Sequence, residues 1–218
     1  VEKSTSMTEG SIWRQLIRFA VPLILGNLFQ QLYNTVDSII VGNYIGKHAL
    51  AAVGACGALI DLLLAFCIGA SVGAGVVIAQ QYGAKDERGV EKAVHTTVAI
   101  AIIFGLIMMA IGISAAPIFL NWMGTPKEVL PQAVLYMRIF FGGMLFSVVY
   151  NYAAGILNAV GNSAKALQYL MIAAGSNIVL DWIFVVVFHM GVEGVALATD
   201  IAQFISCVCI LQYLMKSK

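Results

Sequence analysis

Two segments of this chain place a carboxylate beside amide side chains within a run of apolar residues. The first contains Gln30, Asn34 and Asp37, and the second contains Asn177 and Asp181. An ionised group in hydrocarbon costs roughly 3 kcal/mol or more, so such residues usually mark a path for an ion or a substrate. Burial favours the neutral form of a carboxylic acid, and a second carboxylate nearby favours it further. A pair of this kind can hold a proton or a small cation, which predicts a transporter rather than a membrane anchor.

The spacing of these residues predicts which of them share a helix face. Positions 30, 34 and 37 fall within about 60° on a helical wheel, and positions 177 and 181 are one turn apart. In lipid, polar faces must turn toward other helices or a water-filled cavity. We therefore expect Asp37 and Asp181 to form a cation-binding pair, with a proton or a small cation as its ligand.

Six apolar segments carry these residues, each near the ~20 residues that a spanning helix requires. They cover about residues 19–42, 52–80, 93–117, 130–156, 167–189 and 193–215. Hydrophobic residues make up 61% of the chain and charged residues 11%, against roughly 45–50% and about 25% in soluble domains. The sequence therefore predicts an all-α integral membrane protein, a bundle of six transmembrane helices. The net charge of +1 leaves no basic surface for nucleic acid.

The basic residues predict the orientation of the chain, because cytoplasmic loops carry an excess of Lys and Arg. With the N-terminus in the cytoplasm, only Lys47 and Lys127 fall outside, while nine basic residues fall inside: Lys3, Arg14, Arg18, Lys85, Arg88, Lys92, Lys165, Lys216 and Lys218. Both termini are therefore expected to be cytoplasmic. We expect a cytoplasmic N-terminus with an interfacial lead-in helix (1–18), a membrane lobe (19–215) and a cytoplasmic tail (216–218).

The helical rise predicts how deep the carboxylates lie. Asp37 falls roughly 27 Å and Asp181 about 21 Å along spans that run outward, while Asp61 and Asp200 fall roughly 12–15 Å below the outer surface. Four carboxylates are therefore expected in the outer half of the bundle. Asp61 and Asp200 are equally compatible with structural groups that are capped by neighbouring hydroxyls.

Pro22 has two interpretations that depend on where the first helix begins. Near the first turn, its missing N–H costs little. If the helix begins around Ile12, Pro22 becomes an internal kink.

Several segments resemble the multidrug and toxic compound extrusion (MATE) transporters. Residues 19–37 resemble the first helix of that family, and residues 49–54 and 79–84 resemble the two ends of its second helix. Residues 155–162 are similar to the loop after its fourth helix, and residues 191–199 to the opening of its sixth. The resemblance covers nearly the whole chain.

The resemblance implies an antiporter in a cytoplasmic membrane that exports amphipathic organic cations in exchange for protons or sodium ions. It implies no enzyme activity and no cofactor apart from the coupling ion. Together with the polar faces above, it gives two sets of candidates. The cation- or proton-binding residues are Asp37, Asp181, Asn177, Thr199 and Asn34, and the substrate-cavity residues are Gln30, Tyr136, Asn151 and Asp200.

Family members have two six-helix lobes, whereas this chain ends where a second lobe would begin. A fragment or truncated product is therefore expected before a half-length protein that pairs with a second lobe or with its own copy. The other expected partners are the lipid bilayer and organic cations. Two alternatives stay open. One is a lipid-linked saccharide flippase of the related superfamily, whose cavity would need basic residues for a pyrophosphate, and Arg138 is the single candidate for that role. The other is a membrane scaffold that transports nothing.

Overall fold

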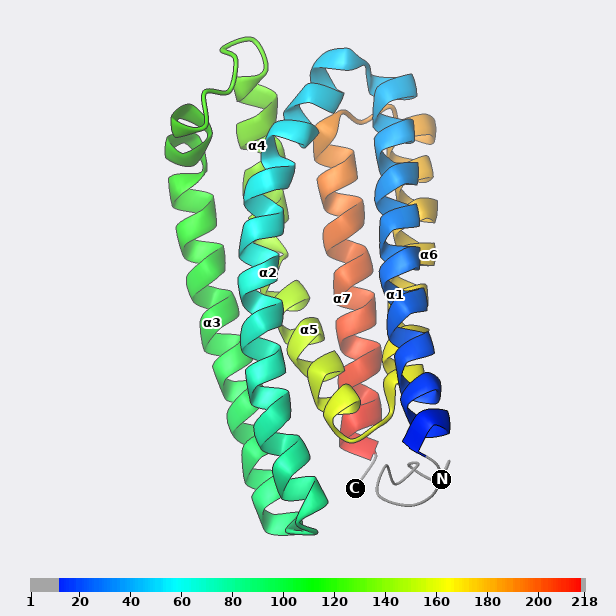
Figure 1. The fold of residues 1–218 in the computed structure, drawn as a ribbon. Coiled ribbons are helices and arrows are strands. Elements are labelled where there is room, and N and C mark those ends of the chain that lie inside the picture. Colours follow the sequence, from blue (N-terminus) through cyan, green and yellow to red (C-terminus); the bar gives the residue numbers. More distant parts are fainter. Residues whose placement is uncertain (1–11, 217–218) are drawn as a thin grey trace.

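The computed structural model describes residues 12–216, which fold into long helices that run side by side (Figure 1). No β-strand occurs in this described range, and the all-α fold is confirmed. The elements are α1 (Ile12–Ile40), η1 (Val41–Ile45), α2 (Lys47–Gly83), α3 (Glu87–Trp122), α4 (Leu130–Gly142), α5 (Met144–Ala159), α6 (Ser163–Asp181), η2 (Trp182–Val187) and α7 (Val192–Lys216), where η1 and η2 are short π-helices.

Length and composition identify four helices that can cross a membrane: α2, α3, the α6–η2 unit and α7. The bent pair of α4 and α5 makes a fifth if it counts as one span. The helix α1 has 29 residues, but its amides and carboxylate make it less apolar than the others. A multi-pass membrane protein is therefore confirmed, whereas the number of six spans stays a prediction.

The helix α1 begins at Ile12 and continues without a break to Ile40, so Pro22 lies inside it. The lead-in helix expected within residues 1–18 is thus part of α1 from Ile12 onward, and residues 1–11 and 217–218 of the expected tails lie outside the described residues. Because proline has no N–H, it leaves the carbonyl of Arg18 without its helical hydrogen bond. Of the two interpretations of Pro22, the structure supports the internal one.

The span between residues 130 and 159 is broken at Gly143, where α4 and α5 meet at an angle of 50°. The Asp200 side chain of α7 lies against this glycine, with no room for a methyl group between them. The N–H of Gly143 itself donates to the carbonyl of Ile139 at 3.4 Å. A carboxylate is well suited to this position, because a helix start has backbone N–H groups without helical partners.

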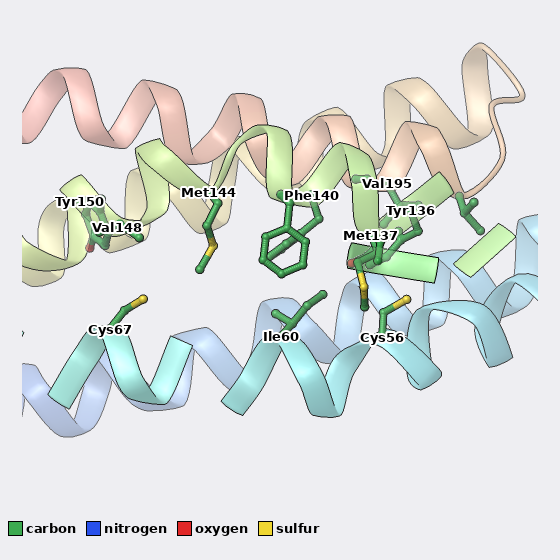
Figure 2. Close-up of a cluster of buried hydrophobic side chains, with 14 of the residues drawn as sticks. Cys56, Ile60, Cys67, Tyr136, Met137, Phe140, Met144, Val148, Tyr150 and Val195 are labelled. Atoms are coloured by element: carbon green, nitrogen blue, oxygen red, sulfur yellow. The ribbon is translucent and has the colours of Figure 1, made fainter. Parts of the chain in front are cut away.

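The helix α7 lies at the centre of the bundle and contacts α4, α5 and α6 extensively. In the most apolar 18-residue segment of α7, 44% of the residues are buried, against 17% in the corresponding segments of α2 and α3. The large apolar side chains that α2 and α3 expose, such as Phe66 and Ile103, are what a lipid-facing surface requires. Between α2 and the α4–α5 pair lies a core that includes Ile60, Phe140 and Met144 (Figure 2).

Candidate cation-binding site

Two carboxylates lie near the ends of α1 and α6, at the end of the bundle opposite the two chain termini (Figure 1). Asp37 lies in the last turn of α1, and Asp181 is the last residue of α6. Each helix continues into a π-helical segment, and η1 and η2 contact each other. These contacts hold the two helix ends together, and the charges of Asp37 and Asp181 lie close enough to interact.

Three of the four carboxyl oxygens of this pair are buried without hydrogen-bond donors among the described residues. Asp181 has no exposed surface, and neither of its carboxyl oxygens has a partner among the described residues. The same holds for Oδ1 of Asp37 and for Oδ1 of Asn177. Buried polar groups are nearly always hydrogen-bonded, so four unpartnered acceptors in one region require an explanation. A bound proton or cation supplies one.

The side chain of Asn177 is oriented by a hydrogen bond to α7. Its Nδ2 donates to Oγ1 of Thr199 at 3.2 Å, and that hydroxyl donates to the carbonyl of Val195 at 3.1 Å. Because the amide nitrogen is occupied in this way, the amide oxygen remains free as an acceptor. Asn177 itself is 3% exposed and lies one turn before Asp181, so its oxygen is on the same side of α6 as the carboxylate.

Replacing Thr199 by Val is expected to destabilise the protein by about 1 kcal/mol, because the buried amide of Asn177 loses its acceptor. Thermal unfolding of the purified protein in detergent measures the change. Thr96→Val is the matched control, since the Thr96 hydroxyl also donates to the carbonyl four residues earlier, at 2.8 Å, but it is exposed. Equal stability of the two variants would show that the Asn177–Thr199 bond contributes nothing.

Two tyrosines lie next to the carboxylates. Tyr136 of α4 is buried, and its hydroxyl lies within range of the charges of Asp37 and Asp181. Tyr33 of α1 is half-buried and lies within range of Asp37 and of Asp61 on α2. The site is therefore built from α1, α4, α6 and α7, with Tyr33 between the carboxylate pair and α2.

This arrangement can bind a small positive charge. Hard cations prefer oxygen ligands, and two carboxylates with an amide oxygen provide them. A carboxylate pair that shares one buried region can equally share a proton. In either case, loss of the cation leaves a buried negative charge that the lobe cannot solvate, which changes the relative energy of its conformations.

The other predicted residues do not all join this group. Gln30 is half-buried one turn before Tyr33, whereas Asn34 is exposed. Asn151 lies on α5, where it donates to the carbonyl of Ser147 at 2.8 Å, in the half of the bundle away from Tyr136 (Figure 2 shows the neighbouring Tyr150 there). Asp200 is held at the Gly143 break. Roles for these residues in a substrate cavity or at the cation stay predictions.

Asp61 lies 14 residues after the first residue of α2, which is about 21 Å along the helix. The helix begins at Lys47, before the apolar segment that the sequence predicts from about residue 52. The gathering of four carboxylates in the outer half of the bundle stays a prediction. Asp61 is also exposed, unlike Asp181.

Sequence reasoning missed Tyr33 and the two π-helical segments. Tyr33 lies three residues after Gln30 and four before Asp37, a spacing that would have placed it beside both. The π-helices have no comparable signal in the sequence, although such segments often occur at functional sites.

The helical bundle and its buried carboxylates define a class: multi-pass helical membrane proteins with ionisable groups buried between their helices. The sequence model of the MatE family matches residues 22–183, and the chain belongs to this family. The chain spans about half the length of the curated relatives that it matches.

Relatives and solved structures agree with this assignment. The chain is 31% identical to the probable multidrug resistance protein YpnP of Bacillus subtilis, over 99% of this chain and 48% of that protein. It is 32% identical to the probable multidrug resistance protein YoeA of the same species, over 95% and 46%. An outward-facing structure of a multidrug resistance MATE family transporter of the MOP superfamily matches with a TM-score of 0.91 and 28% identity, over 99% of this chain and 48% of that one.

Proposed function

We propose that this chain is one lobe of a secondary antiporter that exports amphipathic organic cations in exchange for protons or sodium ions. The observation that carries the proposal is the set of unpartnered buried oxygens on Asp37, Asn177 and Asp181. A lobe whose polar groups served only to hold helices together would pair these oxygens, because each unpaired buried acceptor costs about 1–3 kcal/mol. The names of the relatives, multidrug resistance proteins, support drugs as the substrates, and the acidic site favours those that carry a positive charge.

The transporter needs a second lobe against which this one can move, because alternating access is largely the rocking of one bundle against another. We propose that this partner is another six-helix lobe, or a second copy of this chain. The uneven distribution of basic residues supports a cytoplasmic membrane with both termini inside. A flippase for lipid-linked saccharides fits the site less well, because a pyrophosphate calls for basic residues and the buried group here is acidic.

The test uses the natural gene product that contains these residues, reconstituted in vesicles with a fluorescent organic cation such as ethidium. Movement of ethidium against its gradient is expected when a proton or a sodium gradient is imposed, and the gradient that drives it identifies the ion. In Asp37→Asn this movement is expected to fall roughly tenfold or more, since the site loses half of its negative charge.

Glu128→Gln is the matched control, because it makes the same change of charge in the exposed loop before α4. Its transport is expected to equal that of the unmodified protein. Gradient-driven export that is unchanged in Asp37→Asn would remove the carboxylate pair as the coupling site. An unmodified protein that exports no organic cation under either gradient would overturn the proposed function itself.

A further inference from the structure

A carboxylate outside the cation site lies on the exposed surface of the lobe, far from either end of α2. Asp61 is preceded by 14 and followed by 22 residues of that helix, so it lies on the order of 20 Å from the nearer helix end. Among the described residues no side chain donates a hydrogen bond to it or pairs with it as an ion. An ionisable group at this depth that the lobe leaves uncovered must face water or another polar group, because contact with lipid is costly.

The side of α2 that carries Asp61 turns toward α1. The charge of Asp61 lies within range of Tyr33 on α1, which places it on the side of the bundle that α1 and α2 share. These two helices meet at η1 and then run apart, with α7 visible between them (Figure 1). Gly54 and Gly57, one to two turns before Asp61, have open space where a side chain would begin. The surroundings of Asp61 are therefore open rather than packed.

The helix α1 exposes two different faces. Its exposed apolar residues include Ile24, Leu28 and Leu32, which recur every four residues and form a face suited to lipid. Asn27, Gln31 and Asn34 are also exposed and recur at i, i+4 and i+7, so they form a polar face that adjoins the apolar one, with its centre about 90° away. Amide side chains on the exposed surface of a membrane helix, like a carboxylate, require water or another polar group as a hydrogen-bond partner.

We propose that Asp61 recognises the positive charge of the transported organic cation, on a water-facing wall that also includes the polar face of α1. The proposal rests on the proposed function and assigns the coupling ion and the substrate to different carboxylates. Asp181 is buried and Asp37 is partly buried, and the two take the coupling ion, while Asp61 is exposed and reaches a substrate that is too large to enter their site. Tyr33 lies between the two groups, so a cation at Asp61 acts on the same side chain as the charge of Asp37.

The direct test measures binding of tetraphenylphosphonium, a permanent cation, to the purified natural gene product. Asp61→Asn is expected to weaken its binding about tenfold or more, because the charge that opposes the cation is lost. Asp61→Glu is expected to stay within about threefold, because the charge is retained. Binding of the uncharged triphenylphosphine oxide is expected to be equal in all three proteins, which separates recognition of charge from a change of shape.

Two controls keep the result specific. Glu128→Gln changes the charge by the same amount in an exposed loop and is expected to bind tetraphenylphosphonium normally. Asp61→Asn is expected to keep the stabilisation by the coupling ion that Asp37→Asn loses, measured as an ion-dependent shift of thermal unfolding. Equal tetraphenylphosphonium affinity in Asp61→Asn and the unmodified protein would overturn the inference while leaving the proposed function intact. No binding by the unmodified protein would overturn both.

A labelling experiment tests the position of Asp61 independently. Asp61→Cys is expected to react with a membrane-impermeant maleimide and to be protected by tetraphenylphosphonium. The unmodified chain is the control, since Cys56, Cys67 and Cys207 are buried and Cys209 is partly buried. Absence of labelling, or rescue of Asp61→Lys by reversing a basic residue elsewhere in the gene product, would show that Asp61 is packed or paired and would overturn the inference.

Discussion

Asp181→Asn is expected to lose gradient-driven export roughly tenfold or more while folding at least as stably as the unmodified protein. The loss of transport follows from the loss of the carboxylate that shares a cation with Asp37. The retained stability follows from burial, because Asp181 has no exposed surface and no hydrogen-bond donor for either oxygen among the described residues. Replacing a buried unpaired acid by an amide removes a desolvation cost.

The variant Asp37→Asn/Asp181→Asn distinguishes a shared site from two separate ones. If the two carboxylates bind one cation together, the first substitution removes most of the coupling, and the double variant is little worse than either single variant. Independent sites would give losses that multiply. Export is measured in reconstituted vesicles, and thermal unfolding in detergent is measured on the same preparations. A fall in the melting temperature of Asp181→Asn by several degrees would identify Asp181 as a structural residue instead.

Gly112→Ala is expected to destabilise the fold by about 1–3 kcal/mol, the largest effect on stability that we predict for a single methyl group. Gly112 lies on α3, and a Cβ atom at this position would overlap the ring of Phe141 on α4. Phe141 is 1% exposed, so its ring is enclosed by neighbours that would have to move with it. Thermal unfolding is expected to begin roughly 3–10 °C lower.

Gly69→Ala and Gly73→Ala are the matched controls, since nothing lies within 4 Å of a Cβ atom at either position of α2. Both are expected to be neutral or slightly stabilising, because Ala is the better helix former. Their spacing of four residues matches the small-residue motif of closely packed helices, but at these two positions the described part of the chain packs nothing against α2. A Gly112→Ala variant as stable as these controls would show that α3 and α4 can separate without cost.

The sequence by itself determined the class of the fold and the chemistry of the site. Apolar and polar residues recur along a helix with its period, because each kind must face a different environment. Local spacing therefore predicted the apolar segments, the polar face of α1 and the shared face of Asn177 and Asp181. The expectation that Asp37 and Asp181 lie together agrees with their interaction in the structure. It rested on the argument that polar helix faces turn away from lipid, toward other helices or a water-filled cavity.

Only the tertiary structure decided which candidates share an environment. Asp61 and Asp200 have the same side chain at similar predicted depths, yet Asp61 is exposed while Asp200 lies against Gly143. The difference arises because the neighbours of a residue come from helices far away in the sequence, and their rotation about their own axes depends on packing along the whole bundle. The break at Gly143 and the contact between η1 and η2 have the same origin.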